Sequence, residues 1–250
     1  MESSIQLPCM IFAAGLGTRL KPLTDTMPKA LVPVSGRPLL QILLEKLQQS
    51  GSNRAVINVH HFADQIEQWV QQHPQPLEIT FSDERACLLE TGGAIKHAQL
   101  QLAPFGRFLI HNVDIISNVD LHDFFVRGEG SAAMLLVSPR QTQRYLLFDD
   151  DMRLVGWTNI ATGEVRSPYP DLDPSRYRKY AFAGIHQMST SLFRYFDQWP
   201  DKFSIIDFYL SLCAQEQIQG YLKEDLRLMD VGKLDTLDQA EAFLHSVSED

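Results

Sequence analysis

Residues 8–30 read PCMIFAAGLGTRLKPLTDTMPKA, an apolar run that passes directly into a turn with two glycines and three cations. A strand that leads into a glycine-rich loop brings backbone N–H groups towards a phosphate, because glycine has no Cβ and tolerates positive φ. No Gly-Lys-Ser/Thr of a Walker loop ends this turn, and Leu20 stands at the third glycine position of the dinucleotide fingerprint. The stretch therefore predicts a buried first strand followed by a phosphate-binding loop of another kind.

The cations of this loop strengthen the phosphate interpretation. Arg19, Lys21 and Lys29 are opposed by a single acid, and two prolines stiffen the backbone between them. A loop held in place loses less conformational freedom when a ligand binds. Arg19 can bind a phosphate through two parallel hydrogen bonds, and Lys29 can act as a mobile point charge. Lys21 is equally well explained as a solvated surface charge.

Composition narrows the possible classes of protein. The 250 residues are 44% hydrophobic and 21% charged, which is typical of a globular protein with a sizeable core. The net charge of −9, without a cluster of Lys and Arg, argues against a surface for nucleic acid or an anionic membrane. Three distant cysteines predict reduced, mostly buried thiols. Without a basic leader or a run of about 18 apolar residues, we expect a cytoplasmic protein.

Outward from the opening stretch, strand-like runs alternate with helical patterns. Leu39, Leu43 and Leu47 share one face of the first helix, which Pro38 begins and Gly51 ends. Such alternation predicts parallel strands joined by crossover helices. The strands are expected at 9–14, 54–59, 77–81 and 107–111, and the helices at 38–50, 63–72 and from residue 91.

The second half of the chain has a different pattern of predicted elements. The apolar runs 144–148 and 153–157, joined through DDDM, predict a hairpin, and a long polar connection follows at 161–179. The sheet should therefore be mixed, in one domain spanning 1–250 with an insertion-like lobe at about 140–180. We expect the last elements to be a strand at 181–188, helices from about 190 and at 204–215, a strand at 218–222, and a helix with Leu237, Ala240 and Leu244 on one face.

Two acids follow predicted strands, at the edge where open α/β sheets bind ligands. Asp114 lies in FLIHNVDII (108–116), and Asp230 lies in RLMDVG (227–232). Either acid alone could be a turn or helix cap. Together, two strand-end carboxylates can hold a Mg²⁺ ion that keeps its other positions for water and phosphate oxygens.

Two other polar clusters favour structural interpretations. His60 and His61 are adjacent and have no His or Cys partner at ligand spacing, so structural capping is expected instead of metal binding, with a contribution to substrate recognition as the alternative. FDDD at 148–151 lacks the alternating ligands and the glycine of an EF-hand, so it predicts a hairpin tip.

Beyond these patterns, AAGLGTRLKPLTDTMPKALVPVSGRPLL (13–40) resembles the signature of the sugar-1-phosphate nucleotidyltransferases, G-x-G-T-R-L-x-P-L-T-x-x-x-P-K-x-L. LLETGGAIKHA (88–98) is similar to the L-E-T-G-G-G-I segment of short bacterial members that act on N-acetylmuramate or mannose 1-phosphate, with Ala94 in place of the third glycine. The resemblance implies a Rossmann-like three-layer α/β/α fold with a central mixed, mostly parallel sheet. It also implies Mg²⁺-dependent transfer of a nucleoside monophosphate from a nucleoside triphosphate to a sugar 1-phosphate.

The same resemblance implies roles for individual residues. Arg19 and Lys29 would be catalytic, and Asp114 and Asp230 would hold the metal. Nucleotide binding is implied for Ala13, Ala14, Gly15, Gly17, Thr18, Glu90, Thr91 and Gly92, and sugar-phosphate binding for Asn112, Lys179, Gly184 and Asp207.

Several of these residues also have a simpler structural explanation. Thr91 can simply cap the helix that follows it. Binding of a base would be an additional role of this segment, in which Gly92 and Gly93 let the planar base approach the backbone. A solvated connector charge explains Lys179 as well as a sugar contact does, and an exposed helix face explains Asp207 equally well.

The chemistry fits a sequence that offers no Ser-His-Asp or Cys-His arrangement. A phosphate monoester has a second pKa of about 6, so it is a nucleophile without a general base, and positioning and electrostatics carry the reaction. The expected partners are a nucleoside triphosphate and a sugar 1-phosphate, without nucleic acid or membrane, for a monomer or small homo-oligomer. A cytidylyltransferase for phosphocholine is the alternative enzyme, whereas a non-catalytic module should have lost Lys29 or an aspartate.

Overall fold

The strand predicted first in the sequence lies inside the sheet. The structure, a computed structural model, describes residues 6–248. In it β1 (Cys9–Phe12) runs parallel to β4 (Arg54–Val59) on one side and to β6 (Arg107–Asn112) on the other, and β5 (Glu78–Asp83) is parallel to β4. These are the strands that the alternation predicted, and their parallel arrangement is confirmed.

Beyond β6 the next strand of the sheet runs in the opposite direction. The long strand β12 (Arg178–Ser189) is antiparallel to β6 and to β8 (Ala133–Ser138), and β13 (Ile218–Leu222) is parallel to β8. Along the order β5-β4-β1-β6-β12-β8-β13, only β12 of these seven strands therefore runs against the others. The expectation of a mixed, mostly parallel sheet is confirmed.

Helices cover both faces of this sheet. Neighbouring residues of β1 belong to different apolar clusters, because successive side chains of a strand point to opposite faces. Ile11 packs in one cluster and Met10 in the other, so the predicted three-layer α/β/α arrangement is confirmed. The helices of the first cluster are α1 (Leu39–Gln49), α2 (Ala63–Gln72) and α5 (Leu121–Arg127), and those of the second are α3 (Glu90–His97), α4 (Gln99–Leu102) and α6 (Ile205–Leu212).

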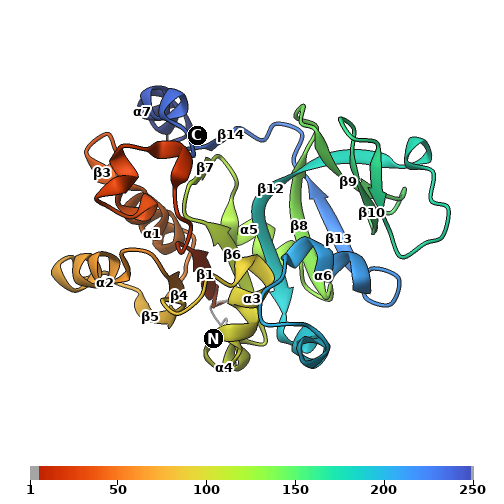
Figure 1. Cartoon of the computed structure of the whole chain (residues 1–250), viewed down its shortest axis with the longest axis horizontal. Helices are drawn as coiled ribbons and strands as arrows, with labels where there is room; N and C mark the ends of the chain where they lie inside the picture. Colours follow the sequence, from red (N-terminus) through yellow and green to blue (C-terminus); the bar gives the residue numbers. More distant parts are fainter. Residues whose placement is uncertain (1–5, 249–250) are drawn as a thin grey trace.

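The last helix packs against the loop that follows β1. In α7 (Leu234–Ser248), Ala240 and Leu244 are buried in a third cluster that also contains Leu20 and Val231. Figure 1 shows α7 beside the short strand β3 and away from the lobe. The segments between β1 and α1 are the 3₁₀ turns η1 (Thr18–Leu20), η2 (Leu23–Asp25) and η3 (Lys29–Leu31) and the two-residue strands β2 (Pro33–Val34) and β3 (Arg37–Pro38).

The predicted lobe contains antiparallel strands that continue the sheet beyond β12. Its hairpin joins β9 (Arg144–Phe148) to β10 (Leu154–Asn159), and Asp149 Oδ1 at the tip accepts hydrogen bonds from the N–H groups of Asp151 and Arg153. The expected connection at 161–179 is wrong in part, because it contains β11 (Glu164–Arg166) and because β12 already begins at Arg178 and pairs with β9. A three-residue edge strand is too short to show a periodicity in sequence. Figure 1 shows β9 and β10 on the side of the molecule opposite α1 and α2.

Two smaller expectations are also decided. The helix expected from residue 190 is a 3₁₀ segment, η6 (Thr190–Gln198). Cys9 and Cys213 are buried and Cys87 is exposed, so the prediction of mostly buried thiols is confirmed. Within residues 6–248, no helix has both the length and the apolar character that a bilayer crossing requires.

Candidate active site

A two-stranded ribbon brings the two predicted metal ligands together. β7 (Ile115–Ser117) pairs antiparallel with β14 (Leu228–Asp230), so that Asp230 lies opposite Ile115. The Val231 N–H donates to the carbonyl of Asp114 over 2.8 Å. Burial and the neighbouring negative charge of Asp114 raise the pKa of Asp230 above its ordinary value. The two carboxylates therefore share one site, although 115 residues separate them in sequence.

Each carboxylate has a cation from the loop after β1. The Lys29 ammonium donates to Asp114 Oδ2, and these two side chains are only 10% and 16% exposed. Arg19 Nη2 lies 3.9 Å from Asp230 Oδ2, in a more open position. Lys21 instead pairs with Asp25 at the surface, over 3.0 Å, as its alternative explanation predicted. The structure thus separates the two predicted catalytic cations from the solvated one.

The glycines of the loop differ in what surrounds them. A Cβ built on Gly15 would meet no atom within 4 Å, so this glycine faces open space. Gly17 has φ of 63°, a left-handed conformation in which glycine is favoured. Its carbonyl accepts the Thr24 hydroxyl over 2.8 Å, which ties the turn to the following 3₁₀ segment. The first glycine leaves room and the second shapes the turn.

A cavity of about 270 Å³ opens beside Gly15. Eight of the predicted site residues line it, drawn from the loop after β1, from the start of α3 and from the end of β6. The remaining predicted residues are not among its lining residues in the described part of the chain. The lining residues are Phe12, Ala13, Ala14, Gly15, Lys29, Asn58, Glu84, Leu88, Glu90, Thr91, Asn112, Val113 and Asp114.

The predicted cap of α3 is wrong. The helix begins at Glu90, one residue before Thr91, and no side chain caps it. The Thr91 hydroxyl instead accepts a hydrogen bond from the Ile205 N–H over 3.0 Å, at the start of α6. Glu90 itself has φ of 62°, in the left-handed region that non-glycine residues seldom adopt.

The glycines after Thr91 also contact protein where the sequence predicted space for a base. A Cβ on Gly92 would lie 2.3 Å from the Phe203 ring, and one on Gly93 would lie 2.0 Å from the Asp201 carbonyl oxygen. The N–H groups of both glycines donate to the Phe203 carbonyl, over 2.9 and 3.2 Å. The room left by their missing side chains is therefore filled by Asp201 and Phe203. A sequence pattern cannot show which distant segment packs there.

The third residue of that motif has a different environment again. Ala94, which stands where the similar proteins carry a glycine, is 1% exposed and packs in the apolar cluster under α3 and α6. Its methyl group therefore lies in the core, away from the lining of the cavity.

Two residues of the site were missed from the sequence. Asn58 and Glu84 line the cavity and are 4% and 2% exposed. Asn58 Oδ1 accepts from the Ala13 and Ala14 N–H groups, over 2.7 and 3.3 Å. Its Nδ2 donates to Glu84 Oε1 over 2.8 Å. The only signal in the sequence was a polar residue inside the apolar strand RAVINV, whereas Glu84 belongs to no pattern.

The histidine pair does not cap α2 as predicted, because this helix begins after Phe62 and no side chain caps it. His60 Nδ1 lies 2.6 Å from the Glu84 carbonyl oxygen, and His61 is exposed with its ring against Phe62. Among residues 6–248, no group of three or more His, Cys, Asp or Glu side chains is arranged to hold a metal ion. The metal candidate is therefore the two-carboxylate site.

The residues predicted for the sugar phosphate fall into two groups. Asn112 and Gly184 lie together, since a Cβ on Gly184 would be 2.8 Å from Asn112 Nδ2. Asp207 instead forms an ion pair with Arg166 of the lobe, whose guanidinium lies 3.8 Å above the Trp157 ring. Lys179 is exposed on β12, opposite Leu147 of β9, so it lies on a strand and not on a connector.

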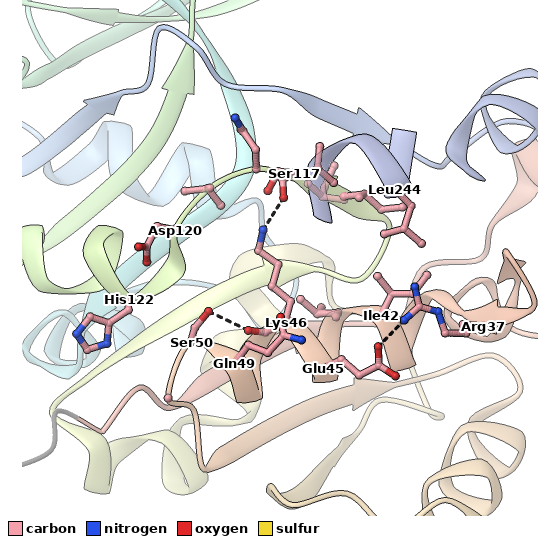
Figure 2. A pocket seen from close by; sticks show the side chains of 17 residues that line it. Arg37, Ile42, Glu45, Lys46, Gln49, Ser50, Ser117, Asp120, His122 and Leu244 are labelled. Atoms are coloured by element: carbon pink, nitrogen blue, oxygen red, sulfur yellow. Dashed lines mark hydrogen bonds and ion pairs between the residues drawn. The ribbon is translucent and has the colours of Figure 1, made fainter. Parts of the chain in front are cut away.

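A larger cavity, of about 740 Å³, lies elsewhere, between α1, α7 and the segment that follows β7. It shares no lining residue with the first cavity. Figure 2 shows Lys46 reaching from α1 to the Ser117 carbonyl, and Arg37 paired with Glu45 at the other end. Burial lowers the pKa of Lys46 to about 8. No residue predicted for the site lines this cavity in the described part of the chain.

The sequence has relatives along nearly its whole length. The family model described as "Nucleotidyl transferase" matches residues 9–145, more than half of the chain. The chain is 32% identical over 246 residues to the N-acetylmuramate alpha-1-phosphate uridylyltransferase of Caulobacter vibrioides, and the match covers 94% of this chain and 96% of the relative. It is 40% identical over 115 residues to the protein of the same name from Neisseria meningitidis, across 46% of this chain and 49% of the relative.

The fold has close neighbours among solved structures. HddC from Yersinia pseudotuberculosis, in a crystal structure complexed with GMP-PN, matches with a TM-score of 0.73 at 24% identity. The match covers 95% of this chain and 99% of that one. At this identity the likeness shows the shared fold.

Proposed function

Because the chain belongs to the nucleotidyl transferase family, and is an enzyme of the sugar-1-phosphate nucleotidyltransferase type, we propose that it transfers a nucleoside monophosphate from a triphosphate to a sugar 1-phosphate. Pyrophosphate is the second product. The triphosphate would enter the cavity beside Gly15, and the sugar 1-phosphate would enter from the side of Asn112 and Gly184.

One observation carries this proposal: two cations and two carboxylates from distant segments meet beside a loop with free space. Lys29 pairs with Asp114, and Arg19 lies near Asp230. The two cations can bind phosphate oxygens directly, and the two carboxylates could do so through a metal ion. A tight turn or a solvated loop would not need four charged groups brought together in this way.

The reaction requires mainly electrostatic stabilisation and positioning of the substrates. A sugar-phosphate oxygen forms a bond to the α-phosphorus, and the bond from that phosphorus to the pyrophosphate oxygen breaks. The nucleophile is already largely dianionic at neutral pH, so no protein group has to remove a proton. Lys29 would hold the α-phosphate and the incoming phosphate together, and Arg19 would stabilise the negative charge that builds on pyrophosphate.

The carboxylate pair fits a magnesium ion. Asp114 and Asp230 supply the hard oxygen ligands that Mg²⁺ prefers. Burial and the proximity of Asp114 raise the pKa of Asp230, and a divalent cation would relieve the repulsion behind the second of these effects. When bound, Mg²⁺ would neutralise phosphate charge. Lys29, Arg19 and the loop N–H groups would position the substrates.

UTP is our proposed nucleotide, and an N-acetylmuramate-like sugar 1-phosphate our proposed acceptor. Support comes from the full-length relative of Caulobacter vibrioides, which carries the name of a uridylyltransferase for N-acetylmuramate alpha-1-phosphate. The proposed acceptor side includes the lobe, because Asp207 of α6 pairs with Arg166 there. We also propose that residues 1–250 act as one domain, with the lobe as an extension of its sheet.

A substrate screen tests the proposal. Pyrophosphate release is measured for UTP, GTP, CTP and dTTP against a set of sugar 1-phosphates and phosphocholine, with and without Mg²⁺. We expect release with UTP and an amino-sugar 1-phosphate, and none without the metal. Activity confined to CTP with phosphocholine would favour the cytidylyltransferase alternative. If Arg19→Ala and Asp114→Ala each kept near wild-type turnover, the assigned roles would be wrong.

A further inference from the structure

We infer that Asn58 and Glu84 act as a positioning pair that holds the two halves of the nucleotide pocket together. This inference rests on the proposed function, because it takes the cavity beside Gly15 as the nucleotide site. Neither residue needs to contact a reacting atom. Their role would be to set where the glycine loop and the turn before α3 stand relative to each other.

The first half of the pocket is held by Asn58. This side chain lies near the end of β4, beside the point where the chain leaves β1. Its Oδ1 accepts the N–H groups of Ala13 and Ala14, the two residues that precede Gly15. The backbone that opens the glycine loop is thus fixed by one buried amide oxygen.

The second half is held by Glu84. Its Oε2 accepts the Leu89 N–H over 3.2 Å, at the residue before α3. Its own N–H donates to the Val59 carbonyl over 2.7 Å, and its carbonyl accepts the Cys87 N–H over 3.0 Å. The turn 84–89, whose Leu88 lines the cavity, is therefore anchored at both ends by one residue.

The hydrogen bond between the two side chains has only one possible direction, from the Asn58 amide to the Glu84 carboxylate. Because Asn58 Oδ1 is engaged by backbone N–H groups, Nδ2 must be the atom that faces Glu84. Both oxygens of Glu84 accept N–H donors, and no Lys or Arg within the described chain forms an ion pair with it. Burial raises the pKa of Glu84. Each donor near its carboxylate still has an acceptor, provided that both Glu84 oxygens accept a hydrogen bond.

This directionality makes a near-isosteric substitution informative. In Glu84→Gln, one side-chain oxygen becomes an NH₂ group. If the amide oxygen of Gln faces Leu89, its NH₂ faces the NH₂ of Asn58. Turning Asn58 over moves the conflict to the Ala13 N–H. In Asn58→Asp, two acceptors face each other instead. Each single change leaves a buried group without a partner, at nearly unchanged volume.

The double swap Asn58→Asp/Glu84→Gln restores every bond. An aspartate at 58 accepts the Ala13 and Ala14 N–H groups with one oxygen and the NH₂ of the new glutamine with the other. The glutamine oxygen then accepts the Leu89 N–H. Net charge and atom count are unchanged, and only the direction of the central hydrogen bond is reversed. A merely space-filling role would not respond to this reversal.

The test combines binding and kinetics of the full chain. Calorimetry with UTP, GTP, CTP and dTTP, each with Mg²⁺ and without sugar phosphate, gives the dissociation constant of the best-bound nucleotide. We expect each single variant to weaken it about tenfold, as a buried unsatisfied polar group does, and the double swap to return within about threefold of wild type. In turnover, KM for the triphosphate should rise while kcat and the KM for the sugar phosphate stay within about twofold.

Ser82→Ala is the matched control. Ser82 is buried at the end of β5, two residues before Glu84, and its hydroxyl has no hydrogen-bond partner among the described residues. We expect this variant to bind the nucleotide as wild type does. Equal weakening in Ser82→Ala and Glu84→Gln would overturn the inference, because strand packing alone would then explain the effect.

Other results would also overturn it. These are a Glu84→Gln variant that binds like wild type, a double swap no tighter than the weaker single variant, or single variants that change all kinetic constants by one factor. If the single variants do not fold, the double swap decides alone: it must fold and bind like wild type. A wild-type chain that binds no triphosphate also overturns the inference. One that binds a triphosphate but releases no pyrophosphate contradicts only the proposed function.

Discussion

Gly15 and Gly92 lie on two segments that line the same cavity, but the space beside each is filled differently. A side chain on Gly15 would enter an open volume, whereas one on Gly92 would enter the Phe203 ring. The loop after β1 directs its cations towards two carboxylates, and the segment at the start of α3 directs its N–H groups towards a backbone carbonyl.

This contrast separates two uses of glycine. In the first segment its absence of a side chain leaves space for a ligand. In the second it lets α3 approach residues 201–205 closely, so that the Thr91 hydroxyl reaches the first N–H of α6. Both segments belong to the signature that the sequence shares with its family, yet only the first is built around open space.

The largest effect is expected from removing the buried cation of the first segment. Lys29→Met should lower kcat by about 10²–10³, since a preorganised charge at the reacting phosphates is lost. Steady-state pyrophosphate release with the best substrate pair measures this. Lys21→Met, which removes the exposed lysine paired with Asp25, should keep kcat within about twofold. Equal losses in the two variants would contradict the distinction between site and solvated cations.

The two glycines themselves provide the next largest difference. Gly92→Ala should lower the free energy of unfolding by about 1–3 kcal/mol, because the new methyl group is forced into the Phe203 ring and carbonyl. Gly15→Ala should change it by less than about 0.5 kcal/mol, but should weaken triphosphate binding. Urea unfolding and calorimetry measure the two effects. A stable Gly92→Ala with weakened nucleotide binding would show that this segment, too, is open to the ligand.

Acid should lower the stability of the fold through His186, which lies against α6. Burial lowers the pKa of His186 to about 3, and its Nδ1 lies 2.8 Å from the Tyr209 hydroxyl of α6. The ring is therefore neutral in the folded state, while the unfolded chain binds a proton below pH 6.5. The free energy of unfolding should fall by about 1.4 kcal/mol per pH unit from this group as pH drops from 6.5 towards 3.

Urea unfolding between pH 7.5 and 5 measures that slope. His111, whose pKa burial lowers to about 4, adds a contribution of the same sign. His186→Phe removes one titrating group and should give a shallower slope, even if its stability at pH 7.5 is lower. An unchanged slope in this variant would contradict the neutral, buried state of His186.

The smallest effect is expected at the hydroxyl that joins α3 to α6. Thr91→Val leaves the Ile205 N–H without its acceptor and should cost about 1 kcal/mol of stability, as the loss of a helix cap does. Thr91→Ser should be close to wild type. We also expect Thr91→Val to raise the KM for the sugar phosphate a few-fold, because α6 carries Asp207.

Ser204→Ala is the control for this bond. The Ser204 hydroxyl caps the same helix from within, by accepting the Ile206 N–H over 3.2 Å, and does not reach α3. The two variants should lose similar stability, and only Thr91→Val should shift the sugar-phosphate KM. A rise in the triphosphate KM alone would favour a direct contact of Thr91 with the nucleotide.

Local patterns sufficed for much of the fold. Continuous apolar runs placed β1 and β4, and helical spacing placed α1 and α2, within one or two residues, because these strands are buried on both faces and each helix buries one apolar face. β11 was not predicted because its three residues show no period. η6 was predicted as an ordinary helix because a 3₁₀ segment and an α-helix have similar apolar spacings. For the site, the quoted motifs identified the charged groups that the structure brings together.

By itself, the sequence determined which residues carry charge, which runs are buried and where the chain must turn. These properties depend on side-chain chemistry and near neighbours, so they can be read along the chain. Only the tertiary structure decided what fills the space beside each glycine, that Asp230 stands next to Asp114, and that Asn58 joins Glu84. Such contacts join segments tens of residues or more apart, and they exist only once the strands and helices have packed.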